Sequence, residues 1–195
     1  MDSLYKGIQT FTHLLDISYH IVIGRKGKSR IIDIEFDKKD CFHLLGLQYL
    51  KDLPQLNRSR DKIFNDIAME RITENTLKKS VFYPKIQERI EYLSALETFF
   101  DDNQTIFKYN YTWNAFSAIR AEFLLENEYL NRTIYIFLDK QKDHIDTFFC
   151  RSFFPKNTLD YGKNQTRWTL LYKEKKKKSL ETTEILYNHL KPPKI

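Results

Sequence analysis

The chain has 195 residues, of which 42% are hydrophobic and 15% aromatic, and this is enough to fill the core of one domain. Cys41 and Cys150 belong to no CxxC pair, which argues against a disulfide framework or a zinc site and predicts two buried apolar side chains. The 5 Gly residues complete no phosphate-cradling loop, and the 5 His residues show no metal-ligand spacing. We therefore expect neither a cofactor nor a metal site.

The sequence contains no apolar run near the roughly 18 residues of a membrane span. Its first residues also lack the basic start and apolar middle of a secretory signal, so we expect a cytoplasmic protein without membrane contact. The net charge is +6, and residues 151–195 hold 11 Lys or Arg against 4 Asp or Glu. This asymmetry favours a polyanionic partner, nucleic acid first, because neutralised phosphates release counterions. A solvated lysine-rich surface is the alternative.

The first half of the chain predicts several helices and one hairpin. Bulky apolar residues recur every three or four positions over most of it, which is typical of amphipathic helices. Two β-branched segments flank the glycine-containing turn 24–29 and predict the hairpin. In chain order, the predicted elements are a helix at 4–18, strands at 19–23 and 30–36, and helices at 41–50, 60–70, 73–79 and 84–100.

Beyond residue 104 the apolar spacing shifts towards two, which predicts one antiparallel sheet. The predicted strands are 105–109, 118–125, 133–139, 145–152 and 167–172, and the turns between them include 126–132, 140–144 and 155–166. A terminal helix at 180–190 follows the lysine run 173–178. The expected fold is α+β, with N-terminal helices and a β-hairpin packed on a C-terminal antiparallel β-sheet. We expect a single domain, 1–195, that ends in a lysine-rich segment, 173–195.

Two parts of the sequence resemble the phage-carried BECR nucleases, the group named for barnase, EndoU, the colicins E5 and D, and RelE. The first is Cys41–Leu50, with the sequence CFHLLGLQYL. The second runs from Ser152 to Leu171 through SFFPK, DY and QTRWTLL, and it looks like the closing hairpin of the fourth phage subgroup. The resemblance implies helices on one face of a small antiparallel sheet and metal-independent cleavage of RNA on the open face.

Metal-free RNA cleavage needs a base for the 2′-hydroxyl, an acid for the leaving 5′-oxygen and cations near the phosphate. His43 is the predicted base, because it lies in the first matched segment and titrates near neutrality. Arg151 is the predicted phosphate clamp, since a guanidinium holds an oxyanion with two hydrogen bonds. Lys156 and Tyr161 are predicted to stabilise charge and donate a proton, and Ser152 to hydrogen-bond phosphate. The alternatives are a packed core histidine, a surface arginine, and ordinary loop or turn-capping residues.

Four further residues are predicted to bind substrate: Gln165, Arg167, Trp168 and Lys173. If 155–166 folds as a hairpin, Arg151 or Ser152 approaches Arg167 across the ladder. Aromatic side chains offer stacking surfaces for unpaired bases, although core packing is their commoner fate. The stacking candidates are Tyr109, Tyr111, Trp113, Phe116 and Trp168, of which we expect only Tyr111 and Trp113 to be exposed.

Two functional hypotheses follow. In the first, the protein is a metal-independent endoribonuclease that acts as a toxin or phage effector on host RNA, with tRNA or single-stranded RNA as the target and an antitoxin or immunity protein as a partner. In the second, it is a non-catalytic phage or anti-phage interaction protein whose basic C-terminal face docks on nucleic acid or on an acidic protein. Growth arrest on expression would distinguish the nuclease from the docking protein.

Overall fold

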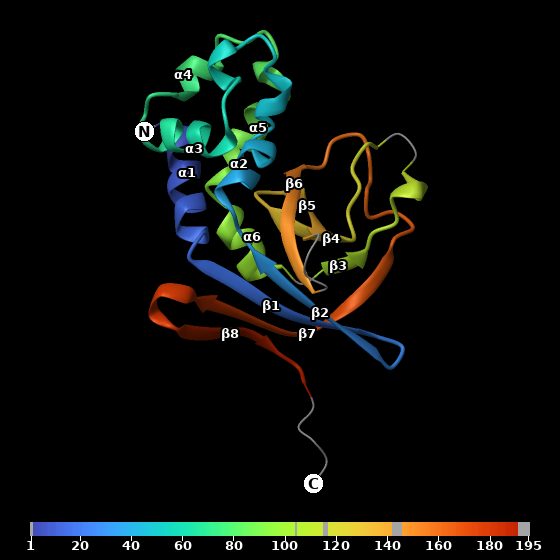
Figure 1. Cartoon of the computed structure of the whole chain (residues 1–195). Helices are drawn as coiled ribbons and strands as arrows, with labels where there is room; N and C mark the ends of the chain where they lie inside the picture. The colour runs from blue at the N-terminus through green and yellow to red at the C-terminus, as the bar shows by residue number, and fades with distance from the viewer. Residues whose placement is uncertain (1, 104, 115–116, 142–145, 191–195) are drawn as a thin grey trace.

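The computed structural model describes residues 2–103, 105–114, 117–141 and 146–190 (Figure 1). Within these ranges the chain forms six α-helices and eight strands. Their bounds are α1 Ser3–Leu14, β1 Ile17–Arg25, β2 Lys28–Glu35, α2 Lys38–Leu44, α3 Arg60–Ala68, α4 Glu74–Leu77, α5 Gln87–Leu93, α6 Leu96–Asp102, β3 Thr105–Lys108, β4 Phe123–Tyr129, β5 Arg132–Lys140, β6 Thr147–Pro155, β7 Thr166–Lys177 and β8 Thr182–Asn188.

The first helix and the hairpin both form, although the helix ends at Leu14 rather than at Ser18 and the hairpin strands are longer than predicted. Asp2 caps α1, because its side chain accepts a hydrogen bond from the Tyr5 N–H at 3.1 Å. In the β1–β2 turn, Lys26 and Gly27 have φ angles of 48° and 75°. Two successive residues at positive φ give the two-residue turn that matches the twist of paired strands. The hairpin prediction is therefore confirmed.

The expected open sheet is wrong, because seven strands close into a barrel. Their order is β1-β2-β6-β5-β4-β3-β7, and β7 pairs with β1 to complete the ring, while β8 lies outside it. The closure depends on β7, whose 12 residues are long enough to pair with β3 at one end and with β1 over the rest. The β2–β6 pairing is parallel, so the sheet is also not purely antiparallel.

The lysine run belongs to a strand. Lys173 is only 1% exposed. Its Nζ donates to the carbonyl oxygens of Asp101, at 3.2 Å, and Asn103, where α6 ends. Burial lowers the pKa of Lys173 to about 8. Lys175 pairs with Glu97 at 2.6 Å and with the Asp101 carboxylate at 2.8 Å. These contacts hold β7 against α6, and they explain why the run continues the strand.

Two predicted helices differ from the structure. The terminal helix expected at 180–190 is wrong, since Thr182–Asn188 forms β8 on the free edge of β7. The β-branched residues of this segment suit a strand, and the edge they pair with exists only in the folded chain. The helix expected at 84–100 is divided into α5 and α6 at Ala95, whose φ of −100° and ψ of 3° leave the helical region. Hydrophobic spacing does not reveal such a break.

The strand expected at 118–125 begins only at Phe123 and continues to Tyr129. Its turn is correspondingly shorter than expected, with Leu130 and Asn131 at φ angles of 48° and 61°. Most of the turn expected at 140–144, with His144, lies outside the described residues. Among those described, no helix has the length and apolar character needed to cross a membrane.

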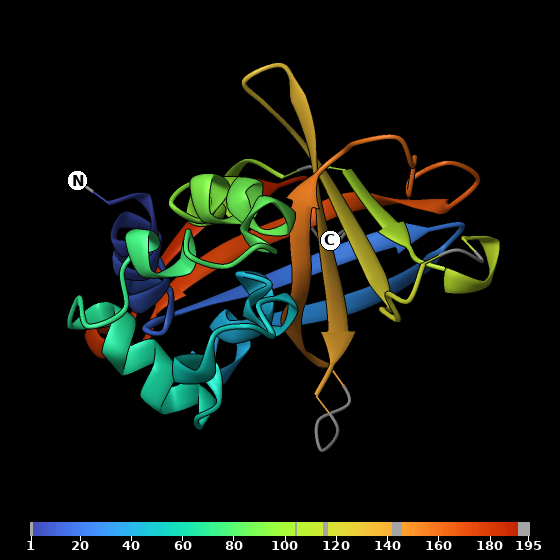
Figure 2. The ribbon, with the colours of Figure 1, turned by 90° about the horizontal axis from the view of Figure 1, so that it is seen from above.

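One main core connects the helices to the strands. Phe11 of α1, Ile90 of α5 and Ile136 of β5 are each 0% exposed within it. Cys41 and Cys150 are also buried there, as predicted. Seen from above, the helices gather beside the strands rather than covering one face of a flat sheet (Figure 2). Both α2 and α5 contact β6, and this junction carries the candidate site.

Candidate active site

A β-bulge in β6 places two predicted site residues next to each other on the outside of the barrel. Phe137 of β5 pairs with Ser152, whereas Leu138 pairs with Cys150, so Arg151 is an extra residue without a partner on β5. Because Cys150 is buried in the core, the bulge leaves both Arg151 and Ser152 on the outer face. Bulges of this kind redirect side chains and are frequent beside active sites.

Arg89 of α5 extends to the bulge. Its Nη1 donates to Ser152 Oγ at 3.1 Å and to the Leu44 carbonyl oxygen at 3.3 Å, and its guanidinium lies 5.2 Å from the centre of the Phe154 ring. Burial lowers the pKa of Arg89. None of the described carboxylates forms an ion pair with it. A half-buried cation bound only to neutral groups is well suited to an oxyanion.

The loop after α2 fits closely around Arg89. Gly46 ends the helical segment with a φ of 76°, in the left-handed region that glycine adopts most easily. A Cβ at Gly46 would lie 2.9 Å from Ile86 Cγ2 and 3.1 Å from Arg89 Cδ. The helix predicted at 41–50 therefore ends early, because this glycine allows the chain to turn beside the arginine.

His43 lies in the last turn of α2, and its ring packs edge-on to Phe42 at 5.6 Å between centres. Burial lowers the pKa of His43, and the charges of Arg60 and Arg151 lower it further. The imidazole is consequently neutral at pH 7 and able to accept a proton. Arg89 links His43 to the bulge, because its guanidinium bonds the carbonyl of Leu44, the residue after His43, as well as Ser152.

Asp40 lies one helical turn before His43 on α2. Burial raises the pKa of Asp40 to about 6, and the negative charge of Asp37 adds to the effect. A carboxyl group with this pKa is partly protonated close to neutrality, as a general acid should be. Sequence reasoning missed both Asp40 and Arg89, since neither falls in a motif that distinguishes it from the other charged helix residues.

We expect Asp40→Asn to raise the free energy of unfolding by about 2 kcal/mol at about pH 8. The folded state binds the Asp40 proton more tightly than the unfolded state, whose pKa is near 3.8, so the stability of the wild type falls as pH rises through about 6. The gain should shrink to less than about 1 kcal/mol at about pH 4, where the folded state is protonated and the unfolded state is nearly half protonated. Urea unfolding at both pH values measures it, with the exposed Asp61→Asn as the control. A gain of equal size at both pH values would contradict the buried-charge explanation.

Tyr161 and Lys156 lie beside the bulge but are engaged in packing and pairing. Tyr161 is 8% exposed, and its ring packs against those of Tyr135 and Phe154. The Lys156 Nζ pairs with Asp160 at 2.6 Å, and this pairing raises the lysine pKa. Tyr161 is close enough to Arg89 to influence its pKa. The structure thus brings Tyr161 near the bulge, with Lys156 at its periphery.

The four predicted substrate-binding residues are not at the bulge. The neighbours of β6 are β5 and β2, so the expected approach of Arg151 to Arg167 across a ladder is wrong. Arg167 is exposed on β7, and Trp168 packs partly against the core. Lys173 is buried at the end of α6. Gln165 is 8% exposed, and it binds the backbone of Asn110 through a 2.7 Å bond from the Asn110 N–H and a 3.2 Å bond to the carbonyl.

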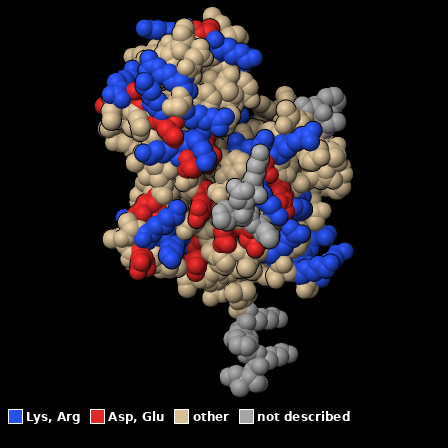
Figure 3. Space-filling model, in the orientation of Figure 1, with Lys and Arg blue, Asp and Glu red and all other residues tan. Residues whose placement is uncertain are grey.

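The exposed aromatic pair is as predicted, with Tyr111 41% and Trp113 54% exposed. Tyr109 is buried, and Phe116 lies outside the described residues. Basic side chains do not gather on the C-terminal strands alone. On the face seen in Figure 3, Lys and Arg also lie over the helices and at the right, whereas acidic side chains are mixed with basic ones near the β7–β8 turn.

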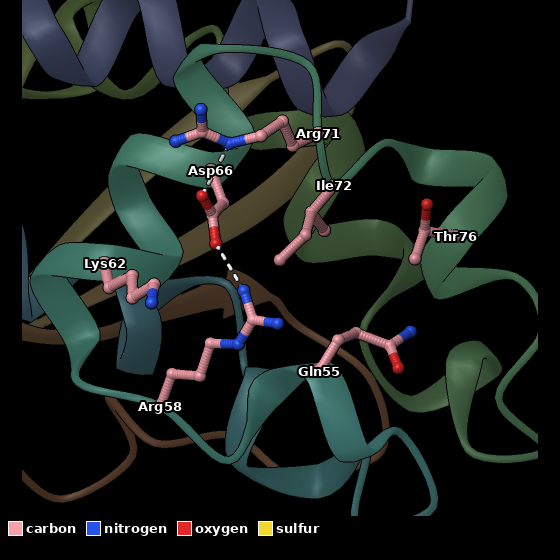
Figure 4. Close-up of a pocket in the computed structure, with 7 residues that line it drawn as sticks. All are labelled: Gln55, Arg58, Lys62, Asp66, Arg71, Ile72 and Thr76. Atoms are coloured by element: carbon pink, nitrogen blue, oxygen red, sulfur yellow. Dashed lines mark hydrogen bonds and ion pairs between the residues drawn. The ribbon is translucent and has the colours of Figure 1, made fainter.

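A separate pocket of about 500 Å³ lies among the helices (Figure 4). Asp66 of α3 lines it, and its carboxylate binds Arg71 Nε at 2.8 Å and Arg58 Nη1 at 3.0 Å. The carbonyl of Asp66 also accepts the N–H of Arg71 and that of Ile72. Both arginines are thus held by a carboxylate, unlike Arg89, and the cluster links the two ends of α3 to the loops beside it.

Comparison with known proteins identifies a family. The family model described as phage-Barnase-EndoU-ColicinE5/D-RelE like nuclease4, PBECR4, matches residues 3–190. Comparison with curated proteins and with solved structures gives no match. The match spans nearly the whole chain and includes both segments on which the resemblance depended. The chain therefore belongs to the PBECR4 family of phage-type nucleases, and this membership implies a nucleic acid substrate.

Proposed function

We propose that the protein is a metal-independent endoribonuclease whose active site is the β6 bulge with the facing residues of α2 and α5. The observation that carries the proposal is the position of the Arg89 guanidinium, which bonds Ser152, next to Arg151 on the bulge, and the carbonyl of Leu44, the residue after His43. Cleavage through the 2′-hydroxyl needs a base and a charged phosphate site, and these groups supply both. RNA is the substrate because DNA has no 2′-hydroxyl.

In the proposed reaction, His43 accepts the proton of the 2′-hydroxyl while the 2′-oxygen attacks phosphorus. Arg89, Arg151 and Ser152 stabilise the negative charge on the two non-bridging oxygens. The bond from phosphorus to the 5′-oxygen then breaks, and that oxygen receives a proton from Asp40. The products are a 2′,3′-cyclic phosphate and a 5′-hydroxyl end. Tyr161 is the alternative proton donor, since its ring lies near Arg89.

Arg151→Ala should lower the rate of RNA cleavage by about 100-fold, because it removes one of the two cations that face the phosphate. The assay uses total tRNA and an unstructured RNA in the presence of a chelator. Arg132→Ala is the matched control, since Arg132 is also ion-paired, with Glu88, and the side chains are 39% and 43% exposed for Arg132 and Arg151. Equal losses of cleavage rate in the two variants would show that Arg151 has no specific role in the reaction. Cleavage that stops when chelator is added would contradict metal independence.

The role as a toxin or phage effector on host RNA, opposed by an antitoxin or immunity protein, is part of this proposal. Induced expression should arrest growth in the wild type but not in the Arg151→Ala variant. The non-catalytic docking hypothesis gains support if RNA stays intact in every assay while the protein still binds it in a salt-dependent way.

A further inference from the structure

A second hollow of about 570 Å³ is lined by the end of β3, by described residues of the segment between β3 and β4, by Asp139 of β5 and by Thr166 of β7. We call it the aromatic groove. Its lining residues include Lys108, Tyr111, Trp113, Arg120, Glu122 and Asp139. None of them belongs to the proposed catalytic group, and the groove combines two exposed aromatic rings with two cations and two carboxylates.

The two exposed rings of the groove are held in place by the backbone. Tyr111 and Trp113 begin and end a single 3-10 turn. The Asn110 side chain caps this turn by accepting the Thr112 N–H at 3.1 Å. Gln165 binds both backbone polar groups of Asn110, as described above, and so anchors the turn to the start of β7. The rings are thus presented by a fixed platform, and Gln165 acts as a positioning residue for it.

The charges of the groove are arranged for an anion. Glu122, whose side chain is 17% exposed, holds Lys108 at 2.6 Å, Arg30 at 3.2 Å and Lys140 at 3.4 Å. Lys108 lines the groove, and Arg30 and Lys140 bind Glu122 from beside it. With Arg151 on the other lining carboxylate, Asp139, the cations around the groove exceed its two carboxylates. The Arg120 guanidinium adds to this excess, 5.0 Å from the centre of the Tyr111 ring. Cations beside stacking surfaces are the combination with which proteins hold single-stranded nucleic acid.

The groove adjoins the β6 bulge. Asp139 lines the groove, and its carboxylate pairs with Arg151 Nη1 at 2.6 Å. An RNA strand with one nucleotide in the groove would therefore place the phosphate of a neighbouring nucleotide near Arg151, the proposed phosphate clamp. Arg151 stands at the boundary between the two, bound to a carboxylate that a phosphate of the substrate is able to replace.

We propose that the aromatic groove binds an unpaired nucleotide of single-stranded RNA next to the cleaved phosphate. The base stacks on Trp113 or Tyr111, and a flanking phosphate binds Lys108 and Arg120. The choice of RNA rests on the proposed function. Stacked and paired bases of a duplex do not expose their faces, so the groove selects single-stranded segments or loops. Stacking tolerates every base, and no sequence preference is expected from this contact.

Tryptophan fluorescence tests the proposal directly. The chain has 2 Trp, and Trp168→Phe leaves Trp113 as the fluorophore while keeping an aromatic ring against the core. His43→Ala in the same protein prevents cleavage during the titration. A short single-stranded RNA should quench Trp113 in a saturable way, whereas a blunt RNA duplex at the same concentration should not. The matched variant Trp113→Phe, which keeps Trp168 instead, should show no quenching.

The affinity of the single strand, measured by anisotropy of a labelled RNA, should fall between about 5-fold and 150-fold in Trp113→Ala. Absence of quenching, or equal quenching by the duplex, would overturn the proposal. Quenching by RNA that the wild type fails to cleave would leave the groove standing and contradict the endoribonuclease. Cleavage by the wild type without any quenching of Trp113 would support the endoribonuclease and overturn the role of the groove.

Discussion

His43→Ala should lower the rate of RNA cleavage by about 1000-fold, within the range that general acid–base groups contribute. Burial keeps the His43 imidazole neutral at pH 7, so that it can accept the 2′-hydroxyl proton. Alanine has no group to replace it. The ring is half-buried at the surface of α2 and packs on Phe42, so its removal should change the free energy of unfolding by less than about 1 kcal/mol.

His13→Ala is the matched control, because His13 also lies in the last turn of a helix and contacts Glu97 at 3.4 Å. It should retain full activity. In the wild type the rate should fall with decreasing pH below the His43 pKa, which lies under the ordinary value of 6.5, because the imidazolium is unable to accept a proton. The histidine role is refuted if His43→Ala keeps this acid limb of the pH–rate profile.

Arg89→Met should lower the cleavage rate by about 1000-fold, the loss associated with removing one preorganised oxyanion donor. Arg89 is half-buried and bonded to Ser152 Oγ and the Leu44 carbonyl rather than to a carboxylate. A cation that has lost its hydration without gaining an ionic partner is costly to the folded protein. Methionine replaces the unbranched stem of the arginine side chain and removes the charge, so the free energy of unfolding should stay equal or increase.

The combination of lost activity with unchanged or higher stability is the diagnostic result for Arg89. Arg132→Met provides the comparison, since that arginine forms a 2.7 Å ion pair with Glu88 and has no place in the proposed reaction. It should cleave RNA normally. Urea unfolding and initial cleavage rates of both variants supply the measurements. A strongly destabilised but active Arg89→Met protein would show that the arginine is structural.

The sequence alone led to part of the proposed site. It led to His43, Arg151 and Ser152, because their residue types suit RNA cleavage and two matched segments contain His43 and Ser152. Arg89 and Asp40 could not be found in this way. Each is one of many charged helix residues, and only burial beside β6 gives Arg89 a lowered pKa and Asp40 a raised one.

The sequence by itself determined the α+β class, the first hairpin, the buried cysteines and the exposed Tyr111 and Trp113, because these features depend on local spacing and turn chemistry. Closure of the barrel was decided by the tertiary structure. It depends on which strand edges meet, and hydrophobic alternation is the same in an open and a closed sheet. The structural role of the β7 lysines also depends on the tertiary structure, because carbonyl and carboxylate oxygens of α6 bind them. The bulge at Arg151 likewise follows from the register between β5 and β6, which no single strand encodes.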